Sequence, residues 1–206
     1  MKDNAGKIGI LGGTFNPVHN GHLIVAEAVR EQVRLDRVLF IPAGTPPHKS
    51  IKEVAPADHR YAMVKCAIES NACFEASHIE IDRAGYTYSI DTLASLKAIY
   101  TEKTEFYFII GADVVPELVT WKDSDRVLEM CRFIAVLRPG NGKEAFKLHI
   151  DELTSRKQAK IITVEAPLID ISSTTIRERV MDGKSIKYLV PECVEKYILD
   201  NELYKE

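Results

Sequence analysis

Residues 8–29 hold the sequence feature that most restricts the fold, a short apolar run that stops abruptly and gives way to an amphipathic segment. The apolar run covers residues 8–11 and ends at two glycines, and a turn follows at Asn16-Pro17. From His22 onward, apolar residues recur at a spacing that places them on one side of a helix. The segment therefore predicts a strand, a turn and a helix, which is the repeating unit of α/β folds.

The same segment predicts a binding site. Two glycines at the end of a strand leave backbone N–H groups uncovered, and the helix N-terminus behind them adds the positive end of a dipole. His19 and His22 lie three residues apart where the loop becomes helix, so both imidazoles should face the same side of the first turn. A metal pair, a capping histidine and chance are alternatives for this pair. The predicted ligand is a phosphate.

The full motif carries a resemblance to a known family. It reads Gly12-Gly13-Thr14-Phe15-Asn16-Pro17-Val18-His19-Asn20-Gly21-His22. This run resembles the signature of the nucleotidylyltransferase superfamily, and specifically that of the bacterial nicotinate mononucleotide adenylyltransferases. The resemblance implies catalytic roles for both histidines and contacts to ATP from the residues that precede them, Gly12, Gly13, Thr14 and Phe15.

Length and composition bound the remaining possibilities. The 206 residues fit one domain over 1–206, and 27 basic against 30 acidic residues give no basic field that would attract nucleic acid or an anionic membrane. No apolar run approaches the roughly 20 residues of a membrane span, and no signal peptide is recognisable, so a cytoplasmic location is predicted. Scattered cysteines without a C-x-x-C pair predict free, mostly buried thiols. The oligomeric state stays open, a homo-oligomer included.

Apolar runs and amphipathic segments alternate along the rest of the chain. Further strands are predicted at residues 37–42, 74–81, 105–111, 132–138 and 160–164. Helices are predicted at residues 22–33, 58–70 and 144–154, in a segment that ends at about residue 100, and near the C-terminus. Five or six short strands in such an alternation give an α/β fold with a single-domain, Rossmann-like, doubly wound and mostly parallel sheet, followed by C-terminal helices.

A proline-rich loop follows the second strand. Open α/β sheets bind ligands where strands end, so Lys49 in this loop could reach a phosphate, although a solvated surface lysine is the plainer interpretation. The family's P-x-x-x-P-P-H-K element is matched by Pro42, Pro46, Pro47, His48 and Lys49. The resemblance implies a catalytic role for Lys49.

Two further segments match the side of the family's site that receives the pyridine ring and the adenosine. Thr87 or Ser89 could simply cap a helix. The family's G-x-S-Y-T-x-D-T element nevertheless corresponds here, with Thr87 for Ser and Ser89 for Thr, and implies mononucleotide contacts from Thr87, Tyr88, Ser89, Asp91 and Thr92. Likewise, I-I-G-A-D followed by a tryptophan implies adenosine contacts from Gly111 and Asp113, and a nicotinate contact from Trp121, which would otherwise suit a core position.

A second phosphate site is predicted at residues 169–177. Four consecutive hydroxyl residues before a helix suit capping, and Thr175 with Glu178 forms a capping-box pattern. Such a helix N-terminus also binds phosphate, and Arg177 adds a fork of donors. The family's I-S-S-T-x-I-R element matches residue for residue, which implies ATP contacts from Ile171, Ser172, Ser173 and Thr174 and a catalytic role for Arg177.

These segments together predict phosphoryl-type transfer by positioning and charge stabilisation, with ATP and nicotinate mononucleotide as substrates, as the resemblance implies. No compact carboxylate cluster appears, so no metal site of the protein's own is predicted, and Mg²⁺ should arrive with ATP. Alternatives are a nicotinamide mononucleotide or phosphopantetheine adenylyltransferase and a non-catalytic nucleotide sensor. A class I aminoacyl-tRNA synthetase fragment shares His-x-Gly-His, but the chain lacks a K-M-S-K-S element.

Overall fold

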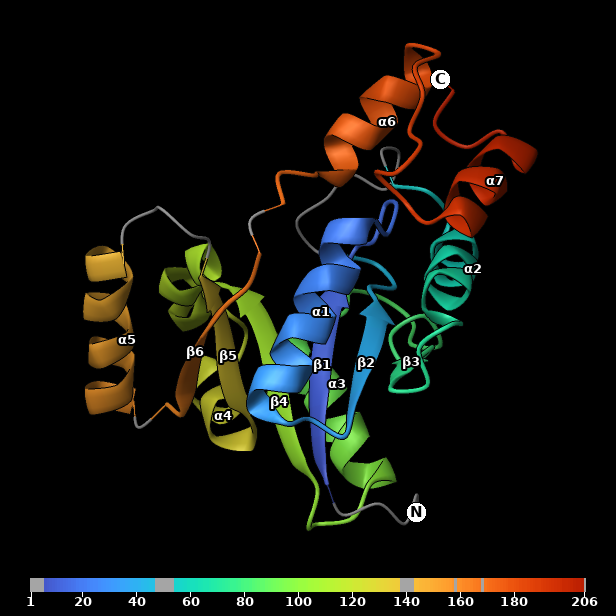
Figure 1. Ribbon diagram of the computed structural model, residues 1–206. Coiled ribbons are helices and arrows are strands. Elements are labelled where there is room, and N and C mark those ends of the chain that lie inside the picture. Colours follow the sequence, from blue (N-terminus) through green and yellow to red (C-terminus); the bar gives the residue numbers. More distant parts are fainter. Residues whose placement is uncertain (1–5, 47–53, 138–142, 158, 168, 206) are drawn as a thin grey trace. The chain divides into compact units, whose positions relative to one another are not determined.

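The computed structural model describes residues 6–46, 54–137, 143–157, 159–167 and 169–205 (Figure 1). Strands and helices alternate along most of this length, as the hydrophobic pattern predicts. The elements are β1 (Lys7–Gly13), α1 (Asn20–Val33), β2 (Arg37–Pro42), α2 (Ala57–Ile68), β3 (Phe74–Ala76), α3 (Ser89–Ile99), β4 (Glu105–Gly111), the 3₁₀ helix η2 (Ala112–Thr120), α4 (Ser124–Met130), β5 (Arg132–Leu137), α5 (Lys143–Lys157), β6 (Ile161–Glu165), α6 (Ser173–Met181) and α7 (Glu192–Asp200).

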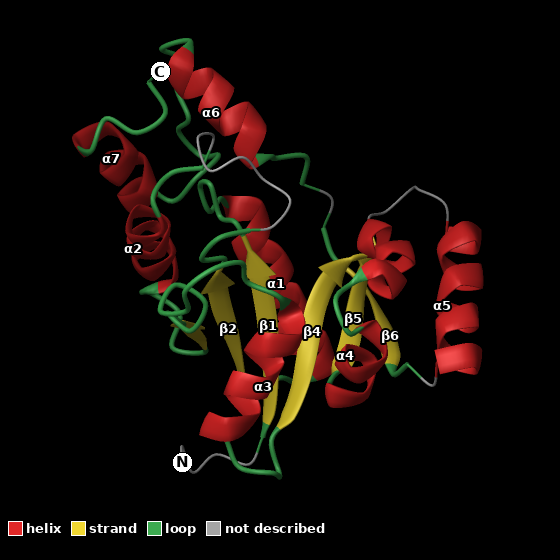
Figure 2. Ribbon diagram, turned by 180° about the vertical axis from the view of Figure 1, so that it is seen from behind, coloured by secondary structure: helices red, strands yellow, loops and turns green. Residues whose placement is uncertain are grey.

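The strands form a six-stranded sheet in the order β3-β2-β1-β4-β5-β6. The pairs β1–β4, β4–β5 and β5–β6 all run parallel, for example with Ile8 opposite Phe106 and Phe108 opposite Phe133. Helix α1 covers one face of the sheet, whereas α3 and α4 cover the other (Figures 1 and 2). This is the doubly wound, Rossmann-like arrangement that the sequence predicts.

The chain divides into two compact units. Unit 1 comprises Met1–Leu11, Val25–Leu39 and Tyr88–Leu168, and unit 2 comprises Gly12–Ile24, Phe40–Thr87 and Ile169–Glu206. The expectation that residues 1–206 form one domain stays a prediction. In unit 1 the buried side chains of β4 and β5 form the core, where the rings of Phe108 and Phe133 stack with centroids 5.9 Å apart.

Unit 2 contains α2, β3, α6 and α7. Helix α2 packs against both β3 and α7. Between the two helices, Nδ1 of His59 and the hydroxyl of Tyr197 lie 3.0 Å apart, and their rings meet edge to face. The last residues of the chain therefore belong to the same packed unit as the loop after β1.

Two local predictions are wrong. The strand expected over residues 74–81 ends at Ala76, because the N–H groups of Ile81 and Asp82 both bond to the carbonyl of His78 in a turn instead of a ladder. Helix α3 begins after Tyr88 without a side-chain cap, so neither Thr87 nor Ser89 caps it. The Thr87 hydroxyl instead donates to the carbonyl of Thr45 (3.4 Å).

The cysteines are free, as predicted, but they are not mostly buried. Cys131 is buried, Cys66 and Cys73 are partly exposed and Cys193 is exposed. Burial raises the pKa of Cys131 to about 12, and burial, followed by a hydrogen bond of the Cys66 thiol to Cys193, raises the pKa of Cys66 to about 12. Cys66 lies on α2 and Cys193 on α7. The hydrophobic pattern alone does not show which side of each of these helices is packed against the rest of the unit.

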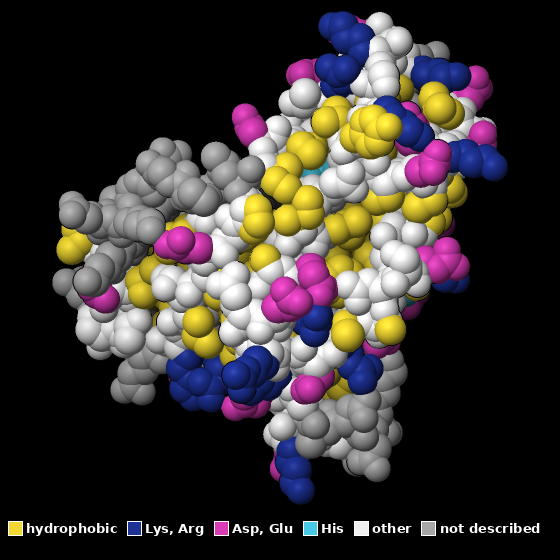
Figure 3. Space-filling model, viewed as in Figure 1, with side chains coloured by type: hydrophobic (Ala, Val, Ile, Leu, Met, Phe, Trp, Pro, Cys, Tyr) yellow, Lys and Arg dark blue, Asp and Glu magenta, His cyan; other side chains and the backbone are white. Residues whose placement is uncertain are grey.

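The surface carries mixed charge. On the face drawn in Figure 3, Lys and Arg side chains are interspersed with acidic ones. Within the described residues, no helix combines the length and the apolar character needed to cross a membrane.

Candidate active site

The loop between β1 and α1 is held in a conformation that its own residues do not favour. Phe15 has a φ of 49°, a left-handed conformation that costs a residue with a side chain about 1–2 kcal/mol. Its ring is 2% exposed and lies 5.1 Å from the ring of His22 and 5.9 Å from that of Phe40, between centroids. Burial of the phenyl ring offsets this strain. Phe15, an expected ATP contact, thus packs against an imidazole.

The two imidazoles share one side of the first helical turn, as the spacing predicts. The rings of His19 and His22 stack, with centroids 3.6 Å apart and an interplanar angle of 28°. The backbone N–H of His19 donates to Nδ1 of His22 over 3.2 Å. A ring nitrogen that accepts a hydrogen bond carries no proton, so neutral His22 holds its proton on Nε2. The loop therefore sets His22 as a donor through Nε2.

Burial keeps both imidazoles neutral at pH 7. It lowers the pKa of His19 from 6.5 to about 4. Burial, followed by repulsion from His19, lowers the pKa of His22 from 6.5 to about 3. Nδ1 of His19 is buried and has no hydrogen-bond partner among the described residues. Because an unpaired buried polar atom is costly, the site has a hydrogen-bonding group to offer a ligand.

Gly21, between the two histidines, makes their stacking possible. A Cβ atom at this position would lie 3.0 Å from Nδ1 and 3.2 Å from Cε1 of His19. Any larger residue would therefore push the His19 ring away. The sequence marks this glycine within the motif but gives no indication that an imidazole lies against it.

The second predicted phosphate segment lies directly on this loop. The hydroxyl of Ser173 donates to the carbonyl of Pro17 (2.8 Å), and Nη1 of Arg177 donates to the carbonyl of Asn16 (2.9 Å). Both residues belong to the first turns of α6. The fold thus joins two segments that lie more than 150 positions apart in the chain.

The capping of α6 differs from the expected capping box. Ser172 is the N-cap, and its Oγ accepts from the N–H of Thr175 over 3.0 Å. Thr175 lies inside the helix, where its hydroxyl is 2.9 Å from that of Ser172. Ser172 has the extended backbone of a capping residue (φ −122°, ψ 147°), so the cap falls three residues before the expected one.

Comparisons with known proteins decide the family. Residues 10–179 match the model of the cytidylyltransferase-like family. A Thermoanaerobacter sp. protein described as "Probable nicotinate-nucleotide adenylyltransferase" is 50% identical over 97% of this chain and 95% of its own length. A Moorella thermoacetica protein with the same description is 46% identical over 97% and 92% of the two lengths. The chain belongs to the nicotinate-nucleotide adenylyltransferase family.

Solved structures of this family share the fold. A Plasmodium falciparum nicotinic acid mononucleotide adenylyltransferase, in structures titled as complexes with APC and with NaAD, superimposes with TM-scores of 0.76 and 0.78. Each structure covers 97% of both chains at 19% and 20% identity, respectively. At such identity the likeness establishes the Rossmann-like architecture alone.

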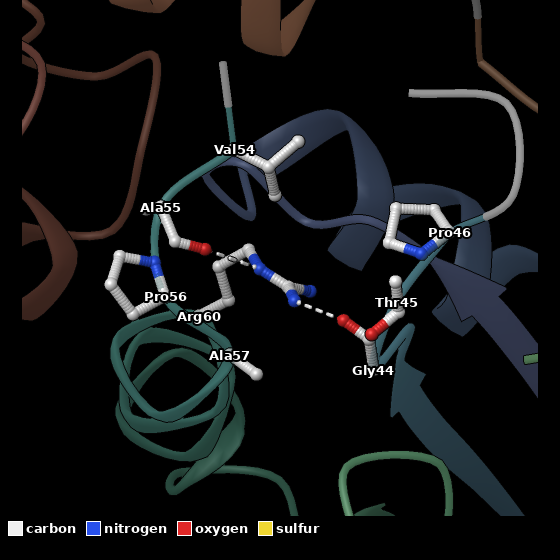
Figure 4. A pocket seen from close by; sticks show the side chains of 8 residues that line it. All are labelled: Gly44, Thr45, Pro46, Val54, Ala55, Pro56, Ala57 and Arg60. Carbon is white, nitrogen blue, oxygen red and sulfur yellow. Dashed lines mark hydrogen bonds between the residues drawn. The ribbon is translucent and has the colours of Figure 1, made fainter. Parts of the chain in front are cut away.

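Arg60 contacts the loop after β1, although no family motif includes it. Its side chain is 1% exposed and donates to three backbone carbonyls: from Nε to Ala55 (2.8 Å), from Nη1 to Thr14 (2.8 Å) and from Nη2 to Gly44 (3.1 Å). Figure 4 shows the guanidinium reaching from α2 toward the ends of two loops, beside a cavity of about 100 Å³. Burial lowers the pKa of Arg60, and the carbonyls compensate the lost hydration.

The motif residues from Tyr88 onward, together with Gly111, Asp113 and Trp121, lie in unit 1. The ring of Tyr88 lies 4.4 Å from Nζ of Lys122, which also forms an ion pair with Asp91 over 3.6 Å. Thr92 is buried and donates its hydroxyl to the carbonyl of Tyr88 (3.3 Å), so this threonine supports the start of α3. Tyr88, Ser89 and Asp91 keep part of their surface exposed.

Trp121 and the Gly-Ala-Asp turn complete the set in unit 1. The Trp121 ring meets those of Phe108 and Phe133 edge to face, at 5.7 and 6.3 Å between centroids, and stays partly exposed. Asp113 is exposed in η2, and a Cβ at Gly111 would collide with its carboxylate. One part of the Trp121 ring therefore packs against the core of unit 1, and another part is exposed to solvent.

The remaining predicted residues are placed as follows. Lys49 falls outside the described residues. Gly12 and Thr174 are exposed, Gly13, Thr14 and Ile171 are partly exposed, and Thr87 is buried. Within the described part of the chain, no three His, Cys, Asp or Glu side chains gather as they would around a metal ion. The donors beside α1 are imidazoles, hydroxyls and a guanidinium, which suit an anion better than a cation.

Proposed function

We propose that the protein transfers the adenylyl group of ATP to nicotinate mononucleotide, releasing pyrophosphate and forming nicotinate adenine dinucleotide, a step of NAD biosynthesis. The observation that carries the proposal is the hydrogen bonding of Ser173 and Arg177 to the loop that stacks His19 on His22. Relatives at 43–50% identity over nearly the whole chain bear the name of this activity. The site thus unites two anion-binding segments of the kind that phosphoryl-type transfer needs.

The chemistry is a displacement at phosphorus. An oxygen of the mononucleotide's 5′-phosphate attacks the α-phosphorus of ATP, the new P–O bond forms, and the bond to the bridging oxygen breaks so that pyrophosphate leaves with that electron pair. The attacking phosphate is already ionised near pH 7, so the reaction needs no general base. Catalysis then depends on orientation and on stabilising the charge of the transition state.

The histidines suit the role of donors. With pKa values of about 4 and 3, they are neutral before ATP binds, and His22 carries its proton on Nε2. An Nε2–H directed at a phosphate oxygen stabilises negative charge without a proton transfer. Approach of a polyanion raises the pKa of any imidazole, which would strengthen the same hydrogen bonds.

The other proposed roles follow the family motifs. Arg177 would neutralise charge on the leaving pyrophosphate together with Lys49, and the hydroxyls of Ser172, Ser173 and Thr174 would bind phosphate oxygens at the start of α6. Gly12, Gly13, Thr14, Phe15, Ile171, Gly111 and Asp113 are the further proposed ATP contacts. Thr87, Tyr88, Ser89, Asp91, Thr92 and Trp121 are the proposed mononucleotide contacts.

We propose that Mg²⁺ accompanies ATP. Nucleotidyltransferases of this kind typically use a divalent metal ion with the nucleotide. The absence of a carboxylate cluster among the described residues fits an ion held by phosphate oxygens and water. Such an ion would offset phosphate charge, while the residues of this chain orient the triphosphate. A single nucleotidylyltransferase domain over residues 1–206 and a cytoplasmic location remain predictions.

A coupled pyrophosphate assay tests this function. The purified protein is given ATP and Mg²⁺ with nicotinate mononucleotide, nicotinamide mononucleotide or phosphopantetheine, and kcat/KM is compared at equal concentrations. We expect the acid to exceed the amide by well over ~10-fold, because each buried donor that faces the amide's NH₂ costs about 1–3 kcal/mol. Equal rates would refute specificity for the acid, and no pyrophosphate with any acceptor would refute adenylyl transfer.

A further inference from the structure

The C-terminal end of the chain returns to the loop that carries the histidines. We propose that Tyr204 is a positioning residue for that loop and acts through Asn16. The inference rests on the adenylyl transfer proposed above, because it assigns Tyr204 a part in placing the donors of that reaction. None of the family motifs used for the site assigns this residue a role.

Asn16 is the point of contact. It is 3% exposed, and its Oδ1 accepts from the hydroxyl of Tyr204 (2.9 Å) and from the N–H of Ala55 (3.0 Å). An amide oxygen has two lone pairs, so these two donors saturate it and fix the direction of the side chain. Ala55 is itself held through its carbonyl by Arg60. The Tyr204 hydroxyl therefore helps to orient a buried amide within the loop.

The chain after α7 is shaped to bring Tyr204 to this point. Glu202 and Tyr204 both have left-handed backbones, with φ of 53° and 64°. The N–H groups of Glu202 and Leu203 bond back to the carbonyls of Leu199 and Ile198 and close the turn. A strained backbone persists only where its surroundings over-determine it. Burial also raises the pKa of Tyr204, so its hydroxyl keeps the proton that it donates.

A short route joins Asn16 to the reactive groups. Its carbonyl accepts from Nη1 of Arg177, so a shift of Asn16 displaces the guanidinium. Two residues further on, Val18 is fully buried, and the next residue is the buried His19, so a shift of the loop at Asn16 should also move His19. The N–H of His19 then sets the tautomer of His22. Loss of the Tyr204 bond should therefore disturb two donor groups without removing either.

Tyr197 provides a matched control. Its hydroxyl also makes one hydrogen bond within unit 2, to Nδ1 of His59 at 3.0 Å, and it lies on the same terminal segment. That bond joins α7 to α2 and does not touch the loop. Replacing either tyrosine by phenylalanine removes one hydroxyl and keeps the ring. A purely structural role for Tyr204 predicts that the two variants behave alike.

The first experiment compares Tyr204→Phe with Tyr197→Phe. Melting temperature, kcat and KM for ATP are measured for both and for the wild type. We expect similar small falls in melting temperature, a decrease of kcat by about tenfold in Tyr204→Phe, and a kcat within about twofold of wild type in Tyr197→Phe. A wild-type kcat in Tyr204→Phe, or an equal loss in Tyr197→Phe, would overturn the proposal.

A measurement without turnover separates this proposal from the function on which it rests. NMR titration of the imidazoles reports the pKa and tautomer of His22 in each variant. We expect the His22 signals to change in Tyr204→Phe and to stay as in wild type in Tyr197→Phe. If the wild type released no pyrophosphate, the proposed function would fail, yet this comparison would still test positioning. Unchanged His22 signals in Tyr204→Phe would refute it.

A double-mutant cycle tests the route through Asn16. If Tyr204 acts only through that residue, Tyr204→Phe should cost no further activity once Asn16 is replaced by Ala. The double variant should then have the kcat of Asn16→Ala alone. Independent, multiplicative losses would show that Tyr204 acts elsewhere. Should Asn16→Ala fail to fold, the tyrosine pair and the His22 titration still decide the matter.

Discussion

In the loop that carries His19 and His22, the hydrogen bonds that fix the loop come from residues far along the chain, whereas the segment around Tyr88 is held by exposed or local contacts. Arg60, Arg177 and Tyr204 reach the loop across 46, 161 and 188 positions, and all three bonds are 2.8–2.9 Å long and partly buried. By contrast, the Lys122–Asp91 ion pair has side chains 48% and 43% exposed.

The difference suits two tasks. Groups that stabilise a transition state must be held close to their reacting positions before substrate arrives, and several buried bonds on one loop achieve this. A segment that recognises a ligand can instead exchange weak, solvated contacts for contacts to that ligand. Exposed ion pairs contribute about 0–1 kcal/mol, so their exchange costs little. The loop should therefore govern turnover and the Tyr88 segment should govern acceptor binding.

The largest expected effect tests the loop. His22→Ala should lower kcat by at least ~100-fold, the usual scale for losing one donor to a transition-state oxyanion. Both acceptors should lose the same factor, because the proposed role of His22 is to donate to ATP. Steady-state kinetics with a circular dichroism check of folding measure this. The matched control is His78→Ala, which removes an imidazole that lies 2.7 Å from exposed Asp82. A folded His22→Ala protein with wild-type turnover would remove His22 from the mechanism.

The sequence predicts the order of elements better than the contacts between them. Short apolar runs identify the strands, since periodicity records whether each residue is buried within its own element. It fails after Ala76, where the chain turns although alternation continues, because the backbone bonds are satisfied locally at His78. The predicted cap of α3 is also wrong, because the hydroxyl of Thr87 donates to the carbonyl of Thr45 and not to the helix start.

The site was predicted in part. The motifs identify His19, His22, Ser173 and Arg177, which the fold brings together. They do not identify Arg60 or Tyr204. Arg60 donates to backbone carbonyls, which every residue has, and Tyr204 donates to the side chain of one asparagine, so the sequence does not show which contacts these two side chains make. Arg60 falls within the helix predicted over residues 58–70, but helical periodicity alone does not show that its charged side chain is buried.

The pKa values of the histidines make the loop sensitive to pH. Both folded-state values, about 4 for His19 and about 3 for His22, lie below the unfolded value of 6.5. The unfolded chain therefore binds more protons at pH 4–6.5, and the stability that the neutral rings contribute above pH 6.5 is lost as pH falls. Each histidine should lower the free energy of unfolding by up to about 1.4 kcal/mol per pH unit in that window.

Urea unfolding at pH 7, 6 and 5 measures this dependence. Carboxylates also titrate in part of the range, so the informative quantity is the difference between wild type and His22→Gln, which lacks one titrating ring. We expect a shallower decline in His22→Gln, by about 1 kcal/mol per pH unit. Equal slopes would show that His22 is not held neutral by burial, and the contrast between a buried loop and an exposed segment would weaken.

The smallest expected effect concerns the exposed segment. Lys122→Met removes the charge that pairs with Asp91 and lies over Tyr88, while an apolar chain of similar length can still cover the ring. Contacts of this kind contribute about 0.5–1 kcal/mol each, so KM for nicotinate mononucleotide should change by about two- to fivefold. The KM for ATP and the kcat should stay within about twofold of wild type, because the proposed donors to the triphosphate lie on other elements. Lys103→Met, at an exposed turn of the same unit, is the control and should change neither constant.

Added salt should diminish the difference between wild type and Lys122→Met, since salt screens an exposed ion pair. If Lys122→Met altered the KM for ATP instead, or left the acceptor constant untouched at low salt, the Tyr88 segment would not be the acceptor side of the site.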